Sequence, residues 1–145
     1  APVLGWYGLR IGCICVERGK RAQAIKSMVA EVKSGKAPAG QLIIYPQGTR
    51  IAPGVSAPYK IGTAALYQET GQICVPAATN VGVFWPKYGI LRQPGLAVVE
   101  FLPAIQTGFD NEEFMHRLEE VIEQSSNALL EEAAIDGFYP LGQDT

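Results

Sequence analysis

The chain has 145 residues, of which 48% are hydrophobic and 18% charged, and its net charge is -2. These values predict one globular domain over residues 1–145, exclude a disordered or fibrous chain, and leave no uncharged apolar stretch long enough to span a bilayer. The charge is unevenly divided: residues 1–60 carry nine Lys and Arg against two Glu, whereas residues 61–145 carry three basic residues against twelve acidic ones. A basic half can attract phosphate, anionic lipid or an acidic carrier protein, although the basic residues between 20 and 36 are better explained as the solvated face of a helix.

The first elements along the chain are a strand, a helix and a second strand. Residues 11–16 form a short apolar run rich in strand-forming side chains. Between Lys20 and Lys33 apolar residues recur every three or four positions, which predicts an amphipathic helix. Residues 42–45 predict a second buried strand, which ends at the Pro-Gln-Gly sequence that follows.

The second half of the chain continues this alternation. Residues 61–69 predict a short helix, residues 73–79 a third strand and residues 96–102 a fourth. A long helix follows Asp110, which can cap it together with Glu113 at the capping-box position. The apolar stripe of that helix consists of Phe114, Leu118, Val121, Ile122 and Leu129. Together these elements predict an α/β fold, a layered sheet with substantially parallel strands flanked by helices.

The three cysteines predict neither a disulfide nor a metal site. Cys13 and Cys15 lie two apart, on one face of a predicted strand, which does not suit a bond between them. No pair of cysteines has the spacing of a zinc site. We therefore expect reduced, buried thiols in a protein that faces the cytosol, with no metal and no cofactor.

The loop after the second predicted strand is a candidate functional site, with the sequence Tyr45-Pro46-Gln47-Gly48-Thr49-Arg50. Open α/β sheets bind ligands beyond the carboxyl ends of their strands. Gly48 permits a tight turn, Thr49 offers a hydroxyl, and Arg50 offers a planar set of donors for phosphate or carboxylate. An ordinary turn with a surface arginine explains these residues equally well.

Arg18 follows the first predicted strand in the same way. Parallel pairing of the two strands would bring Arg18 and Arg50 to one edge of the sheet, as a site for an anion. The alternative is a surface pair between Glu17 and Arg18 with little effect on stability.

Several stretches of the sequence resemble, in order and spacing, the motifs of one enzyme family. Residues 3–18, which end in Glu17-Arg18, resemble its second motif, and residues 45–50 resemble its third, Phe-Pro-Glu-Gly-Thr-Arg. Residues 60–62 and 73–77 resemble the downstream Lys-x-Gly and the fourth motif around Val-Pro. The chain thus resembles the 1-acylglycerol-3-phosphate (lysophosphatidate) acyltransferases of phospholipid synthesis, from residue 2 to about residue 103.

The resemblance implies a glycerol-3-phosphate acyltransferase-like fold and the transfer of an acyl chain from acyl-CoA or acyl carrier protein to lysophosphatidate. It places the protein at the cytoplasmic face of a membrane, peripheral or anchored through a preceding segment, with no nucleic-acid partner. It also implies that Arg50, Thr49, Gly48, Gln47 and Arg18 bind the substrate phosphate, with the alternative that Arg18 supports the acceptor pocket without touching the acceptor. Gln47 stands where the family has Glu, and its neutral amide supplies no negative charge.

The family's catalytic pair, a His that acts as general base and an Asp that orients it, belongs to a His-x-x-x-x-Asp motif before the second motif. The sequence has a single histidine, His116, and Val121 stands five positions after it, so we expect a surface role for His116. We expect the chain to be a fragment, the C-terminal portion of an acyltransferase domain, that contains no catalytic residue and is inactive alone. The alternative is a non-catalytic module that binds anionic lipid or phosphate.

Overall fold

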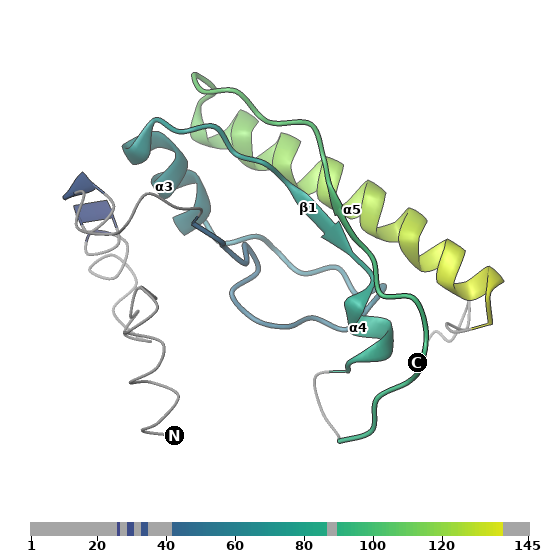
Figure 1. The fold of residues 1–145 in the computed structure, drawn as a ribbon. Helices are drawn as coiled ribbons and strands as arrows, with labels where there is room; N and C mark the ends of the chain where they lie inside the picture. Colours follow the sequence, from purple (N-terminus) through teal and green to yellow (C-terminus); the bar gives the residue numbers. More distant parts are fainter. Residues whose placement is uncertain (1–25, 27–28, 31–32, 35–41, 87–89, 138–145) are drawn as a thin grey trace.

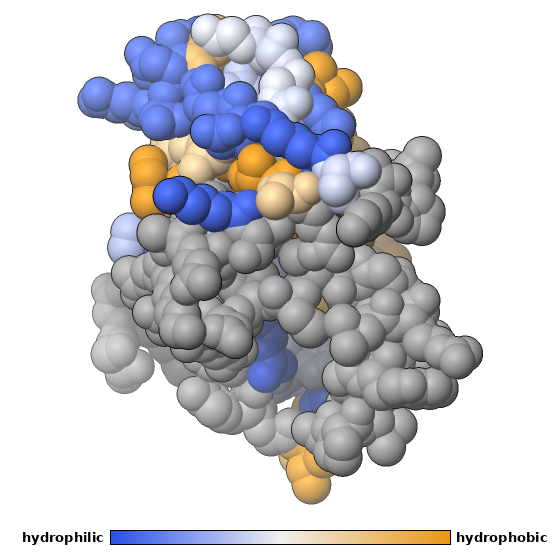
Figure 2. Space-filling view, turned by 90° about the vertical axis from the view of Figure 1, so that its left-hand side faces the viewer, coloured by the Kyte–Doolittle hydropathy of each residue, from blue (hydrophilic) through white to orange (hydrophobic). Residues whose placement is uncertain are grey.

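The computed structural model describes residues 26, 29–30, 33–34, 42–86 and 90–137 (Figure 1). Its elements in chain order are α3 (Gly62–Thr70), β1 (Ala77–Thr79), α4 (Val81–Phe84), β2 (Val99–Phe101) and α5 (Asn111–Ile135). The long helix α5 packs against β1 and α3, with α3 near its beginning and α4 towards the opposite end of the molecule (Figure 1). Hydrophilic residues gather at the upper end of the molecule, where α3 and the first turns of α5 lie (Figure 2).

The sheet among the described residues consists of β1 and β2, which pair antiparallel with Ala78 opposite Glu100. Side chains along a strand point alternately to its two faces. Pro76 and Ala78 are therefore buried together, on the side of the strand that α5 covers. Val99 and Phe101 belong to the opposite face and remain 54% and 76% exposed. The sheet thus has one packed face and one apolar face that the described residues leave open.

The main core lies between α3, α5 and the segment that leads into α5. Tyr67 of α3 stacks on Phe114 of α5 with ring centroids 3.9 Å apart. The hydroxyl of Tyr67 donates to the carbonyl oxygen of Gln106 and accepts from the backbone nitrogen of Phe109. The other buried members of this core are Ala64, Ile105 and Leu118. An aromatic pair with a satisfied hydroxyl therefore joins the two helices.

Most elements predicted for the second half of the chain are confirmed. The helix α3 lies where residues 61–69 predict one, and β1 and β2 lie inside the predicted strands. The helix α5 begins as its capping pattern predicts, because Oδ1 of Asp110 accepts a hydrogen bond of 2.9 Å from the backbone nitrogen of Glu113. The predicted stripe is buried at Phe114, Leu118 and Leu129 and half-buried at Val121 and Ile122.

The buried strand predicted over residues 42–45 is wrong. Leu42, Ile43 and Tyr45 are 41%, 75% and 79% exposed, and no strand among the described residues pairs with this segment. A buried strand needs hydrogen-bonded neighbours on its edges and cover on both faces, and a hydrophobic run does not by itself provide them. The parallel pairing is likewise not confirmed, because the sheet that the structure describes is antiparallel.

The first predicted strand, residues 11–16, lies outside the described residues, as do Cys13 and Cys15. Of the helix predicted between Lys20 and Lys33, the four described positions 26, 29, 30 and 33 are helical. The short helix α4 was not predicted, because a single turn of four residues leaves no periodic pattern.

Candidate functional site

The loop from Tyr45 to Arg50 forms the tight turn that its sequence predicts. The backbone nitrogen of Gly48 donates to the carbonyl oxygen of Tyr45 over 2.9 Å. Gly48 has a φ angle of 70°, a conformation that residues with a side chain rarely adopt. Glycine is therefore the residue that this turn requires.

Lys60 lies directly against this turn. Its backbone nitrogen donates to the carbonyl oxygen of Pro46 over 2.8 Å, and a Cβ built on Gly48 would lie 3.6 Å from Cγ of Lys60. This separation is ordinary van der Waals contact, so the stem of the lysine covers the glycine. The sequence did not predict Lys60 as a binding residue, although the Lys-x-Gly motif at residues 60–62 pointed to this position. The fold brings this cation to residues twelve positions earlier in the chain.

The helix α3 begins at Gly62, two residues after Lys60. Its first turn contains no acidic residue, and Ile61 at its N-cap makes no side-chain hydrogen bond to it. The backbone nitrogens of Thr63 and Ala65 donate to the carbonyls of Lys60 and Ile61, both over 3.1 Å. Because a helix N-terminus carries a partial positive charge, it adds to the charge of Lys60 at this place. The turn at Gly48, Lys60 and the start of α3 are therefore neighbours in the fold.

The side chains of the candidate loop are accessible. Gly48, Thr49 and Arg50 are exposed and Gln47 is half-buried. No ion pair among the described residues involves Arg50. The loop does not follow a paired strand, so the candidate residues lie at a turn next to Lys60 and not at the predicted edge of a sheet. Arg18, the other predicted member of the site, lies outside the described residues.

Tyr59 connects the segment at residues 42–60, which contains the candidate site, to the helix α5 through a hydrogen bond. Its half-buried hydroxyl donates to Oε1 of Glu123 over 2.9 Å. Burial, and then the neighbouring Glu123 carboxylate, raise the pKa of the Tyr59 phenol well above its usual range. The phenol therefore stays protonated at neutral pH and keeps donating to the helix.

The other titratable side chains that the structure describes form no second site. The side chain of His116 is 77% exposed and its Nδ1 lies 3.8 Å from Glu120, a surface position as expected. The thiol of Cys74 is half-buried, and burial raises its pKa, which makes it a poorer nucleophile. Within the described part of the chain, no group of three or more His, Cys, Asp or Glu side chains is placed to hold a metal ion.

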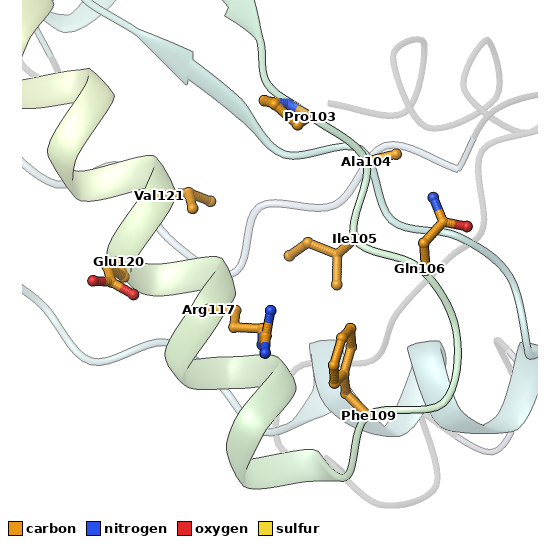
Figure 3. A pocket seen from close by; sticks show the side chains of 8 residues that line it. All are labelled: Pro103, Ala104, Ile105, Gln106, Phe109, Arg117, Glu120 and Val121. Carbon is orange, nitrogen blue, oxygen red and sulfur yellow. The ribbon is translucent and has the colours of Figure 1, made fainter.

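A hollow of about 360 Å³ lies between α5 and the segment that precedes it (Figure 3). Its walls include the side chains of Ile105 and Phe109, with the guanidinium of Arg117 4.2 Å from the centre of the Phe109 ring. Arg117 donates to the carboxylate of Glu113 over 2.8 Å. Because this arginine is already neutralised, the hollow is less suited to a phosphate than the region around Lys60.

Comparison with known proteins defines the class to which the chain belongs. Residues 1–80 match the family model described as Acyltransferase, a match that includes the loop at residues 45–50, Lys60 and all of α3. The chain therefore belongs to the acyltransferase family, which confirms the resemblance drawn from its motifs.

Two curated relatives carry the name 1-acyl-sn-glycerol-3-phosphate acyltransferase. The protein from Pseudomonas aeruginosa is 30% identical over 104 residues, and the one from Saccharomyces cerevisiae is 29% identical over 110 residues. These matches cover 72% and 73% of this chain but 40% and 36% of the relatives, so the chain spans less than half of their length. No solved structure shows a significant match.

Proposed function

We propose that the chain forms the acceptor-binding part of an acyltransferase that acts on lysophosphatidate in phospholipid biosynthesis. The observation that carries the proposal is the contact between Gly48 and Lys60 at the start of α3, with Thr49 and Arg50 next in the chain. In this proposal Arg50 and Lys60 pair with the phosphate of the acceptor, and Thr49 and Gln47 donate further hydrogen bonds. The names of the two relatives support this choice of substrate.

The proposed reaction joins the acyl chain to the free hydroxyl of the acceptor. The hydroxyl oxygen attacks the carbonyl carbon of a thioester of CoA or acyl carrier protein, the C–S bond breaks, and the thiol leaves. A general base must take the proton of the hydroxyl during the attack, because an alcohol at neutral pH is a poor nucleophile. His116 does not suit this role, because it lies exposed on α5 beside Glu120. We therefore propose that the 145-residue chain alone transfers no acyl chain and serves to hold the acceptor.

The architecture and location of the complete enzyme belong to the same proposal. Family membership supports a glycerol-3-phosphate acyltransferase-like fold. No helix among the described residues is long and apolar enough to cross a membrane. We place the protein at the cytoplasmic face of a membrane because its proposed acceptor is a lipid.

The test is the binding of a short-chain lysophosphatidate to the purified chain, measured by calorimetry. A charge-assisted hydrogen bond to phosphate contributes about 1.5–3 kcal/mol, so Arg50→Ala should weaken binding roughly tenfold to a hundredfold. Arg50→Lys should recover part of the loss, because an ammonium keeps the charge without the planar fork. Arg18→Ala should have a smaller effect. Arg117→Ala is the matched control, because this exposed arginine is paired with Glu113. Equal affinity for the wild-type chain and Arg50→Ala would contradict the assignment.

The second candidate is a non-catalytic module that binds phosphate or anionic lipid. It is favoured by the exposed position of His116, the single histidine of the sequence. The coding sequence upstream of Ala1 distinguishes the two, because a His-x-x-x-x-Asp motif there supports the enzyme and its absence supports the module. Turnover of acyl-CoA and lysophosphatidate by the purified chain, abolished by Arg50→Ala, would show that the base lies within these residues.

A further inference from the structure

The segment from Pro46 to Lys60 is a loop whose two ends are joined. The backbone nitrogen of Lys60 donates to the carbonyl oxygen of Pro46 over 2.8 Å. A second turn lies inside the loop, where the backbone nitrogen of Val55 donates to the carbonyl oxygen of Ala52 over 3.2 Å. Loops with ends this close are compact, and their packing fixes their shape. How the loop is attached to the rest of the molecule therefore decides how firmly its two ends are held.

Contacts at Pro53 and Tyr59 attach this loop to neighbouring helices. A Cβ built on Gly82 of α4 would lie 3.1 Å from Cγ of Pro53, so the proline ring lies against that helix. The ring of Tyr59 packs against the core between α3 and α5, and its hydroxyl donates to Oε1 of Glu123 over 2.9 Å. The first contact lies in the middle of the loop, whereas the second lies one residue before its end at Lys60.

The hydrogen bond of Tyr59 is the contact that bears directly on Lys60. The two residues are adjacent in the chain, so a displacement of Tyr59 also moves the lysine stem that covers Gly48. Glu123 lies 64 positions after Tyr59, beyond residues 1–80 that match the family model. A hydrogen bond requires a defined direction as well as a distance, so it restrains the position of the phenol more narrowly than packing alone. The helix α5 thus restrains the end of the loop that contains the lysine.

We propose that Tyr59 and Glu123 are positioning residues for the acceptor phosphate, an inference that rests on the function proposed above. The bond between them holds Lys60 against the turn at Gly48, two positions before Arg50. Neither residue touches the acceptor. They set the fraction of molecules in which the loop has its binding conformation, and the apparent affinity falls in proportion to that fraction. The helix α5 therefore acts on acceptor binding in addition to covering the core.

The first test measures the affinity of variants of the full 145-residue chain for short-chain lysophosphatidate by calorimetry at pH 7. Tyr59→Phe keeps the packed ring and loses the hydroxyl, so binding should weaken about fivefold, as expected for one half-buried hydrogen bond. Glu123→Ala should weaken binding equally, and the double variant no further, because both remove the same bond. Glu123→Gln should restore binding, because its amide oxygen also accepts from a phenol. The matched control is Glu119→Ala, which should leave the affinity unchanged: Glu119 lies one turn earlier on α5, and its charge reaches the phenol without a hydrogen bond.

The outcomes separate this inference from the proposed function. If the wild-type chain binds and Arg50→Ala does not, wild-type affinity in Tyr59→Phe would overturn the positioning role alone. No binding by the wild-type chain would overturn the proposed function, and the inference with it. A loss for Glu123→Gln as large as for Glu123→Ala would assign the effect to charge and overturn the inference. An equal loss for Glu119→Ala would do the same.

The second test needs no ligand and follows hydrogen exchange of single backbone amides. The amide of Lys60 reports on the loop, because it donates to Pro46, and the amide of Cys74 reports on the fold, because it donates to Ile105 over 3.0 Å. In Tyr59→Phe the amide of Lys60 should exchange about fivefold faster, while that of Cys74 keeps its rate, because only the loop opens more often. Unchanged exchange at Lys60, or equal acceleration at both amides, would overturn the positioning role.

Discussion

The core between α3 and α5 and the segment at residues 42–60 are built in different ways. In the core, Tyr67 and Phe114 stack and are almost fully buried. In the segment, Ile43 and Tyr45 are mostly exposed, and the chain is held by the turn at Gly48 and by a few hydrogen bonds. The residues proposed to bind substrate thus lie on a loop, and the packed elements beside it supply the rigidity. Stability and binding should therefore respond to different substitutions.

The largest effect is expected at the centre of the core. Phe114 is fully buried, so Phe114→Ala removes a packed ring and leaves a cavity. The free energy of unfolding should fall by about 3–5 kcal/mol, measured by urea denaturation. The control is Ile43→Ala, because Ile43 is 75% exposed. This substitution should change the free energy of unfolding by less than about 0.5 kcal/mol. Similar losses at the two positions would show that the segment is as firmly packed as the core.

Tyr59→Phe tests the link between the segment and α5. The lost hydrogen bond to Glu123 should reduce the free energy of unfolding by about 1 kcal/mol at pH 7, because the pair is only half-buried. The folded-state pKa of Tyr59 is raised, so its stabilisation is fully present below the unfolded value of about 10 and is lost as the pH rises above it. The difference in free energy of unfolding between the wild-type chain and Tyr59→Phe should therefore disappear between about pH 10 and pH 12. A constant difference across that range would mean that the phenol does not donate to Glu123.

Asp110→Ala tests the start of α5, on the core side of the comparison. Loss of the cap on the nitrogen of Glu113 should cost about 1 kcal/mol, measured by thermal unfolding. Asp110→Asn should retain most of the stability, because an amide oxygen also accepts this bond. A loss as large for Asn as for Ala would assign the effect to charge at the helix N-terminus instead of the cap.

The smallest effect on stability is expected from Arg50→Ala. Arg50 is exposed and forms no ion pair among the described residues, so its removal should change the free energy of unfolding by less than about 0.5 kcal/mol. The same variant should lose most of its affinity for the phosphate ligand. A loss of stability above 1 kcal/mol would instead make Arg50 a structural residue.

The sequence determined the elements whose signals are local. The cap that Asp110 places on the nitrogen of Glu113 and the 3.6-residue stripe of α5 depend on neighbours within one helix, and both are present as predicted. The turn at Gly48 is local as well, because it depends on one backbone conformation. The motifs around residues 45–50 and 60–62 also sufficed to indicate the acyltransferase family, which residues 1–80 confirm.

The tertiary structure decided which strands pair and which side chains meet. The run at residues 42–45 is as hydrophobic as a buried strand, yet it is exposed because strand formation depends on partners elsewhere in the chain. Lys60 reaches Gly48, and Tyr59 reaches Glu123, through contacts that span 12 and 64 positions. Such contacts depend on how distant parts of the chain pack together, and no local pattern records them. Periodicity fixes the faces of an element, whereas packing between elements fixes what those faces touch.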